Sequence, residues 1–420
     1  MTWLILGLSI LWASPAQAAP SQRSLAQSTP GAAPQLYLLP ASGADVILET
    51  HLADLRLDGS LVAMEASYRL RNPTEGPVML GLRLSPGGDL SLSGFEGLSL
   101  TADGQALPLQ PSGDGGYTSQ VAIPADGRVL LRLVYQVSLG NNALATVRYA
   151  PAVLNQWPGN ISLRVQLLIG EGLPTDAWME VAPDGWTYGM PANPTETSIK
   201  WLYDANIPDT AFVFRLIAPA TWAQLQEAKG AAVDGAPPAN FVRLGDLYRR
   251  LYREAPSDTL RNRFYAQAVA AYTAGLTKAA PGAAPQDQAA LHVGLAHLYR
   301  DRVVEAGSVT NEQYARLVVD EVTAALALLP SDDAQRAELE RWQVDGLRVL
   351  LNAYYAQQNW AGALAIIDQL AALPPGAVDP AFVAEERRAI LVQQALQFMQ
   401  QGNREAALAV AGNQIAADGL

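Results

Sequence analysis

The sequence predicts two domains of different class, an all-β domain followed by an all-α domain. Hydrophobic residues alternate with a period of two from residue 35 to residue 218, and with a helical period from residue 240 onward. The length of 420 residues agrees, because single hydrophobic cores stop growing at roughly 250–300 residues. With 50% hydrophobic and 16% charged residues, the composition is typical of a folded globular protein.

The first 18 residues have the features of a signal peptide. Residues 4–13 are almost wholly apolar, and Ala16-Gln17-Ala18 is a small-x-small cleavage site. The apolar run is far shorter than the ~20 residues that span a bilayer, so we expect cleavage and no transmembrane segment afterwards. Residues 19–34 are rich in Ser, Ala, Gln and Pro and should form a flexible leader. The sequence therefore predicts an exported protein, periplasmic or extracellular.

The charge and the cysteine count exclude several kinds of site. The chain has no cysteine, which excludes disulfides, thiolate metal sites and thiol nucleophiles, and in an exported protein favours a bacterial cell envelope. The formal net charge of −12 is spread over both halves. Such a field disfavours binding to nucleic acid or anionic lipid.

Residues 35–218 are predicted to form an antiparallel β-sandwich. Asp-Gly pairs stand between the alternating runs and supply the positive φ that tight hairpins require. One strand ends in the turn Asn72-Pro73-Thr74, and a later segment reads Trp157-Pro158-Gly159-Asn160-Ile161. In these two segments the domain weakly resembles uncharacterised extracytoplasmic sandwich domains of envelope proteins.

After a predicted linker at residues 219–239, residues 240–420 are predicted to form helical hairpins. Leu244-Gly245 followed by Tyr248, and Leu347, Leu350-Leu351 and Tyr354-Tyr355 followed by Trp360 and Ala363-Leu364, match the helix pattern of tetratricopeptide repeats. On these residues the C-terminal half resembles a tetratricopeptide array. The motif positions 248, 299, 354 and 398 are 51, 55 and 44 residues apart instead of ~34, so an irregular α-solenoid is expected.

The resemblance implies a concave groove lined by the first helix of each hairpin. We therefore expect a non-enzymatic interaction or scaffold protein that binds a protein or peptide through this groove, with arginines that pair with carboxylates of an acidic or C-terminal segment. Alternatively, these arginines are solvated or paired with Asp246 and Asp301 within the array. The groove residues expected from the resemblance are Asp246, Arg249, Arg250, His297, Arg300, Arg348, Asn352 and Tyr355, beside Val242 and Val293.

No pattern predicts catalysis, a cofactor or a metal. His292 and His297 are five residues apart, about 140° around a helix, and therefore cannot share one ion. The segment 170–175 lacks the third glycine of a dinucleotide loop. The paired carboxylates at 332–333 and 385–386 are expected to cap a helix and to face solvent. We accordingly predict that the protein is not an enzyme.

Aromatic residues near the end of the β domain leave a second function open. On one exposed sheet face they would stack on sugars and make the protein a carbohydrate-binding envelope protein. The same alternation is equally typical of a buried sandwich strand. The residues concerned are Trp178, Trp186, Tyr188, Trp201 and Tyr203.

Overall fold

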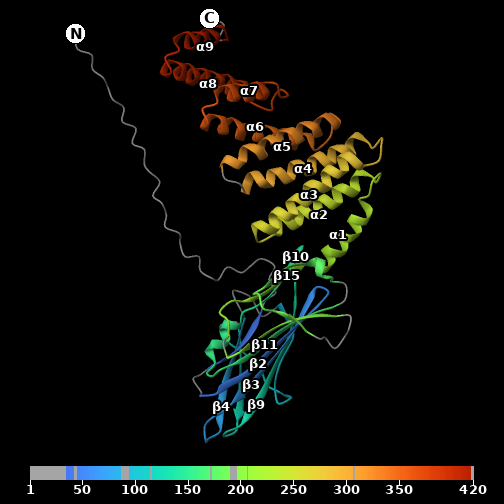
Figure 1. Cartoon of the computed structure of the whole chain (residues 1–420), viewed down its shortest axis with the longest axis vertical. Helices are drawn as coiled ribbons and strands as arrows, with labels where there is room; N and C mark the ends of the chain where they lie inside the picture. Colours follow the sequence, from blue (N-terminus) through green and yellow to red (C-terminus); the bar gives the residue numbers. More distant parts are fainter. Residues whose placement is uncertain are drawn as a thin grey trace, which may run out of the picture.

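The computed structural model is β-rich in its first half and helical in its second, which confirms the predicted order of the two halves (Figure 1). It describes residues 35–41, 45–86, 94–113, 116–170, 173–189, 196–205, 207–305 and 308–417. The predicted signal peptide and leader lie outside the described residues.

The largest sheet has eight strands in the order β13-β14-β11-β2-β3-β9-β5-β6. All its neighbouring strands are antiparallel except β2 and β11, which are parallel although more than a hundred residues separate them. The strands are β2 (Ile47–Asp58), β3 (Leu61–Arg71), β5 (Phe95–Ala102), β6 (Gln105–Ala106), β9 (Arg128–Ser138), β11 (Ser162–Ile169), β13 (Thr187–Tyr188) and β14 (Thr197–Asp204).

Two smaller antiparallel sheets complete the β half. One has the order β1-β4-β8-β7 and the other β10-β15-β12. Their strands are β1 (Leu36–Pro40), β4 (Val78–Pro86), β7 (Gln110–Pro111), β8 (Tyr117–Ile123), β10 (Leu144–Tyr149), β12 (Trp178–Ala182) and β15 (Phe212–Ile217), and short 3-10 segments span Pro151–Gln156 and Thr175–Ala177. Buried side chains from all three sheets form one hydrophobic core.

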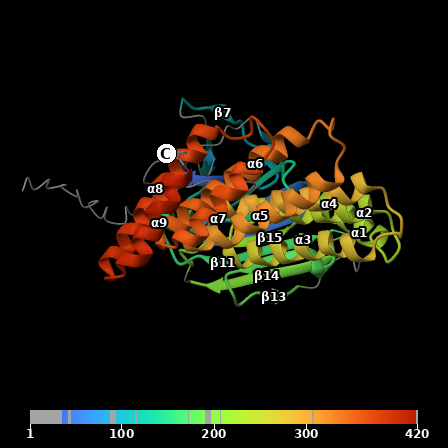
Figure 2. The same ribbon diagram turned by 90° about the horizontal axis from the view of Figure 1, so that it is seen from above.

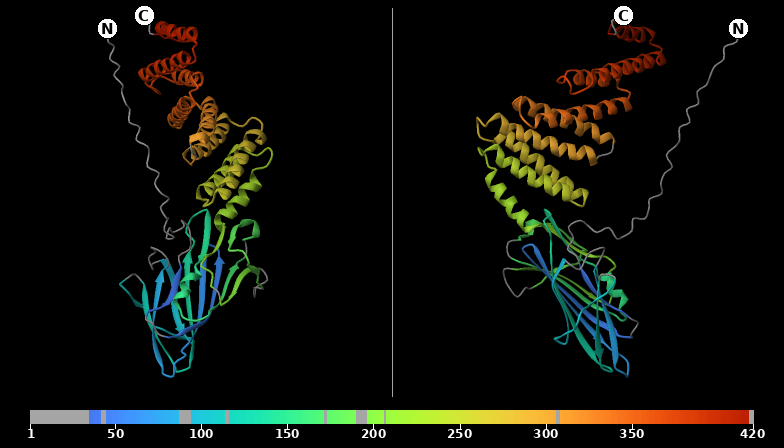
Figure 3. Two further views of the ribbon diagram at one scale, coloured as in Figure 1. Left: turned by 60° about the vertical axis from the view of Figure 1, so that its left-hand side comes forward. Right: turned by 180° about the vertical axis from the view of Figure 1, so that it is seen from behind.

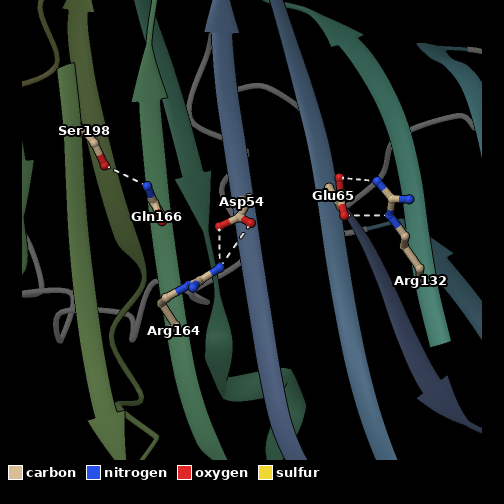
Figure 4. Close-up of polar contacts among 6 residues, drawn as sticks. All are labelled: Asp54, Glu65, Arg132, Arg164, Gln166 and Ser198. Atoms are coloured by element: carbon tan, nitrogen blue, oxygen red, sulfur yellow. Dashed lines mark hydrogen bonds and ion pairs between the residues drawn. The ribbon is translucent and has the colours of Figure 1, made fainter. Parts of the chain in front are cut away.

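The two faces of the eight-stranded sheet differ, as the period of two predicts. On β3, every second residue from Val62 to Leu70 is at most 2% exposed. On the opposite face, Asp54 of β2 and Glu65 of β3 lie directly across from each other, an arrangement that repels. Arg164 of β11 bonds Asp54 at 3.2 Å, and Arg132 of β9 bonds Glu65 at 2.5 and 2.6 Å (Figure 4). The neighbouring strands β11 and β9 thus neutralise the carboxylates of β2 and β3.

The helices follow one another away from the β half, each packing on the next (Figures 1 and 3). Ser257, Asn359 and Asp379 cap α3, α7 and α8 by accepting bonds from backbone N–H groups of the first turn. The helices are α1 (Pro219–Ala231), α2 (Pro238–Glu254), α3 (Asp258–Lys278), α4 (Pro285–Glu305), α5 (Ser308–Leu328), α6 (Arg336–Ala356), α7 (Trp360–Ala371), α8 (Pro380–Gln400) and α9 (Arg404–Ala417). Among the described residues no helix has the length and apolarity to cross a membrane.

The two halves share a packed junction. Seen from above, the helices lie in front of much of the β half, and β13 and β14 remain visible beside them (Figure 2). Leu144 of β10 and Ile217 of β15 belong to the same hydrophobic cluster as the first helices. The Glu254 carboxylate at the end of α2 accepts hydrogen bonds from the backbone N–H groups of Ala143 at 2.5 Å and Leu144 at 3.1 Å. Within residues 219–239 the structure forms α1.

Candidate functional site

A cleft of about 720 Å³ lies between α2 and α4, close to the junction with the β half. This volume falls within the range of small-molecule sites. We call it the α2–α4 cleft; its lining residues are Val242, Asp246, Arg249, Arg250, Arg253, Glu254, Ala290, Val293, Gly294, His297 and Gln335.

A buried tyrosine packs between the two helices that form the cleft and bonds one of its lining residues. The ring of Tyr272, on α3, lies between α2 and α4 at two glycines: a Cβ added to Gly245 or Gly294 would stand 2.4 or 2.3 Å from its Cε1 atom. Its hydroxyl donates a hydrogen bond of 2.6 Å to Oδ1 of Asp246. Burial, and then the negative charge of Asp246, raise the pKa of Tyr272, so the phenol remains a donor at neutral pH. The Asp246 carboxylate is thereby held in place on the cleft wall.

Three arginines stand on the α2 side of the cleft. Arg249 donates from Nε to Oδ2 of Asp301 at 2.7 Å. Arg250 donates from Nε to Glu254 at 3.2 Å and from Nη2 to the carbonyl of Asn141 at 2.5 Å. Among the described residues we find no hydrogen-bond partner for Arg253, or for the terminal nitrogens of Arg249. Guanidinium donors therefore remain available to a ligand.

His297 faces the cleft from α4. Its ring meets the Trp342 ring edge-on, with centroids 4.4 Å apart. Burial, and then the positive charge of Arg249, lower the pKa of His297 below the ordinary 6.5. The imidazole is therefore neutral near pH 7 and can both donate and accept a hydrogen bond.

The structure brings four of the eight expected groove residues together in this cleft: Asp246, Arg249, Arg250 and His297. The other four lie further along the helices. Arg300 stacks over Trp342 at 4.7 Å, Arg348 stacks over Phe382 at 5.3 Å, the Tyr355 hydroxyl donates to Glu386 at 2.8 Å, and Asn352 is exposed.

Sequence reasoning missed three polar or charged residues that line the cleft, and also the tyrosine that holds Asp246. Arg253, Glu254 and Gln335 stand at or beyond helix ends, where a repeat motif assigns no role. Tyr272 matches the aromatic position of a second helix, but the motif does not reveal that its hydroxyl reaches Asp246. Two glycines on facing helices, Gly245 and Gly294, were the available signal, because each admits a close neighbour.

The other two histidines lie outside the cleft. His292 contacts Glu321, with Nδ1 and Oε2 2.6 Å apart, and His51 lies inside the β half. Over the part of the chain that the structure describes, no three His, Asp or Glu side chains gather in a group that could hold a metal ion.

The aromatic residues at the end of the β half do not form one exposed platform. Trp201 is 2% exposed and donates from its indole to the carbonyl of Pro183 at 2.9 Å. Trp178 and Tyr203 pack on phenylalanines of β15, while Trp186 meets the exposed Tyr188 edge-on.

No family model matches the sequence, and no curated protein matches it. Solved structures do match. A protein described as nutrient binding from Legionella pneumophila has 10% identity and a TM-score of 0.39, covering 56% of this chain and 89% of its own. An M1 zinc metallopeptidase from Deinococcus radiodurans has 10% identity and a TM-score of 0.27, covering 84% and 92%. A two-domain M1 zinc metallopeptidase bound to L-tryptophan has 11% identity and a TM-score of 0.28, covering 84% and 95%.

These structures contradict the prediction of a non-enzymatic interaction or scaffold protein. The two metallopeptidases cover most of this chain and are enzymes, and none of the three is a tetratricopeptide protein. The peptide-binding scaffold and its glycan-binding alternative are therefore withdrawn. The prediction failed because it took a function from a helix pattern that also suits other helical arrays.

The likeness carries no activity to this chain, since its TM-scores are only 0.27–0.39 at identities of 10–11%. The zinc in the metallopeptidases' names would need a cluster of donor side chains, and the described residues contain none. We derive no step through a metal.

Proposed function

We propose that the protein binds a small organic anion, a carboxylate or a phosphate ester, in the α2–α4 cleft. The observation that carries this proposal is the set of three arginines beside a cleft of about 720 Å³. Such binding suits a receptor and the substrate site of an enzyme alike.

The arginines favour an anion because their pairing within the protein is incomplete. Asp301 and Glu254 each engage one Nε, which fixes Arg249 and Arg250 while leaving guanidinium donors for a ligand. Two parallel N–H donors of one guanidinium match the two oxygens of a carboxylate or phosphate. Asp246, whose Oδ1 accepts from Tyr272, and the neutral His297 can orient the rest of the ligand.

The test is calorimetric titration with sulfate, succinate, glutamate and glycerol 3-phosphate. Arg249→Gln and Arg253→Gln should each weaken binding by about tenfold, as expected for a charge-assisted hydrogen bond. Arg404→Gln is the matched control, because Arg404 is exposed at the start of α9 and away from the cleft. Absence of binding by all four anions at millimolar concentration, or equal weakening by the control, would show that the cleft is not an anion site.

The same proposal includes a finer description of the fold. Three sheets around one core support a β-sandwich, and helices that pack successively on one another support an irregular, tetratricopeptide-like solenoid.

A further inference from the structure

A second hollow, of about 610 Å³, lies between α7 and α8 near the far end of the helical half. We call it the α7–α8 pocket. It shares no lining residue with the α2–α4 cleft. Its lining residues are Leu370, Ala371, Leu373, Pro374, Pro375, Gly376, Val378, Pro380, Val383, Ala384, Arg387, Arg388 and Leu391.

The walls of this pocket are apolar and continuous with a core. Leu370 is 2% exposed, and Leu373, Val378 and Val383 pack partly buried against the same cluster of buried residues. The connection from α7 to α8 contains Pro374, Pro375 and Gly376, and Gly376 has a φ of +91° that other residues rarely adopt. Two fixed proline φ angles and this turn hold the apolar wall in one shape.

Two adjacent arginines of α8 stand among these apolar groups. Arg387 donates from Nη2 to Oδ1 of Asp368 at 2.5 Å, with side chains that are 35% and 63% exposed. An ion pair this exposed is weak and exchanges readily for another anion. Arg388 is exposed and lines the pocket as well. A mostly apolar hollow with a few convergent charged groups is the general form of a small-molecule site.

We infer that the α7–α8 pocket binds a straight-chain fatty acid, with its carboxylate at Arg387 and Arg388 and its alkyl chain against Leu370, Leu373, Val378 and Val383. The positive charge selects a carboxylate over a cationic or neutral head group, and the apolar side chains of the walls favour an alkyl tail. This site is independent of the α2–α4 cleft, because the two share no lining residue.

The experiment is a titration of the full chain with hexanoate, heptanoate and octanoate. Each added methylene should lower Kd by about fourfold, as full burial of one CH₂ requires. Octanol and octyltrimethylammonium have the same tail without the carboxylate, and each should bind at least about tenfold more weakly than octanoate, because neither accepts a charge-assisted bond from arginine.

Variants locate the site. Arg387→Gln should weaken octanoate by about tenfold and leave octanol unchanged. Val383→Asp should abolish octanoate binding, and circular dichroism checks that this variant is folded. Arg249→Gln, in the other cleft, should leave octanoate binding unchanged while weakening sulfate. The inference is overturned if Kd does not depend on chain length, if the cationic or neutral ligand binds as tightly as octanoate, or if only Arg249→Gln removes binding.

Discussion

The β half and the last helices of the helical half differ in how deeply they bury their apolar side chains. On β3, the residues that face the core from Val62 to Leu70 are at most 2% exposed. On α8, Ile390 is the one side chain that is fully buried. Val392, Leu396 and Met399 of the same helix are 42%, 50% and 55% exposed. A strand between two neighbours in a closed core has little freedom, whereas a helix near the end of a stack has packing on fewer sides.

Polar side chains show the same contrast. Asn72 is fully buried, and its amide donates to the carbonyls of Gly76 at 2.8 Å and Pro124 at 3.0 Å and accepts from Thr74 at 3.0 Å. In the α2–α4 cleft, Asp246 and Arg253 are exposed. The comparison teaches that Asn72 uses its whole amide to fix a turn of the β half, whereas these polar groups of the cleft remain accessible.

Equivalent leucine truncations in the two regions should differ most. Leu70→Ala removes a fully buried side chain and should lower the free energy of unfolding by about 2–5 kcal/mol. Leu396→Ala removes a side chain that is 50% exposed and should cost less than about 1 kcal/mol. Hydrogen exchange followed by mass spectrometry measures the stability of each half separately. Equal costs would mean that α8 is covered by a partner in solution.

A buried histidine should make the β half sensitive to acid. His51 is fully buried, with Nε2 2.5 Å from the Tyr149 hydroxyl, and burial lowers its pKa from 6.5 to about 3. The unfolded chain protonates His51 more readily than the folded chain does. The contribution of neutral His51 to the free energy of unfolding is therefore complete above pH 6.5 and is lost as the pH falls towards 3. Between pH 7 and pH 5 the free energy of unfolding should fall by about 2 kcal/mol because of this one residue.

The His51→Phe variant isolates this contribution. Its urea-unfolding free energy should fall less between pH 7 and pH 5 than that of the wild type, by about the 2 kcal/mol assigned to His51. His292→Gln is the control, since that histidine is half-buried between α4 and α5. An unchanged pH dependence in His51→Phe would show that water reaches the imidazole.

Local features of the fold could be predicted from the sequence, and long-range ones could not. The period of two reveals strands, and Asn72-Pro73-Thr74 reveals a turn, because both depend on neighbouring residues. The bond from Asn72 to Pro124 and the parallel pairing of β2 with β11 join distant segments, and no local pattern specifies them.

The candidate site shows the same limit. Groove positions taken from a repeat resemblance include Asp246, Arg249 and His297, which do lie together in the cleft. The resemblance also groups Arg348 with them, although Arg348 stacks on Phe382 of α8 instead. Irregular repeat spacing changes which helix faces meet, so each position carried over is less informative the further it lies along the array.

The smallest expected effect is on the pH dependence of sulfate binding. It tests whether His297 of the cleft, unlike the buried His51, can carry a charge that a ligand contacts. The pKa of His297 lies below 6.5 because of burial and Arg249, while Asp301, Glu338 and Asp246 oppose this shift. Lowering the pH past this depressed pKa should therefore protonate His297 and add a positive charge to the cleft. Sulfate keeps its charge over this range, so its Kd should fall by about twofold to fivefold, the effect of a partly exposed charge pair. His297→Gln should bind sulfate with a Kd that changes little with pH. A wild-type Kd that rises on acidification would instead mean that protonation repels Arg249 and disorders the arginines.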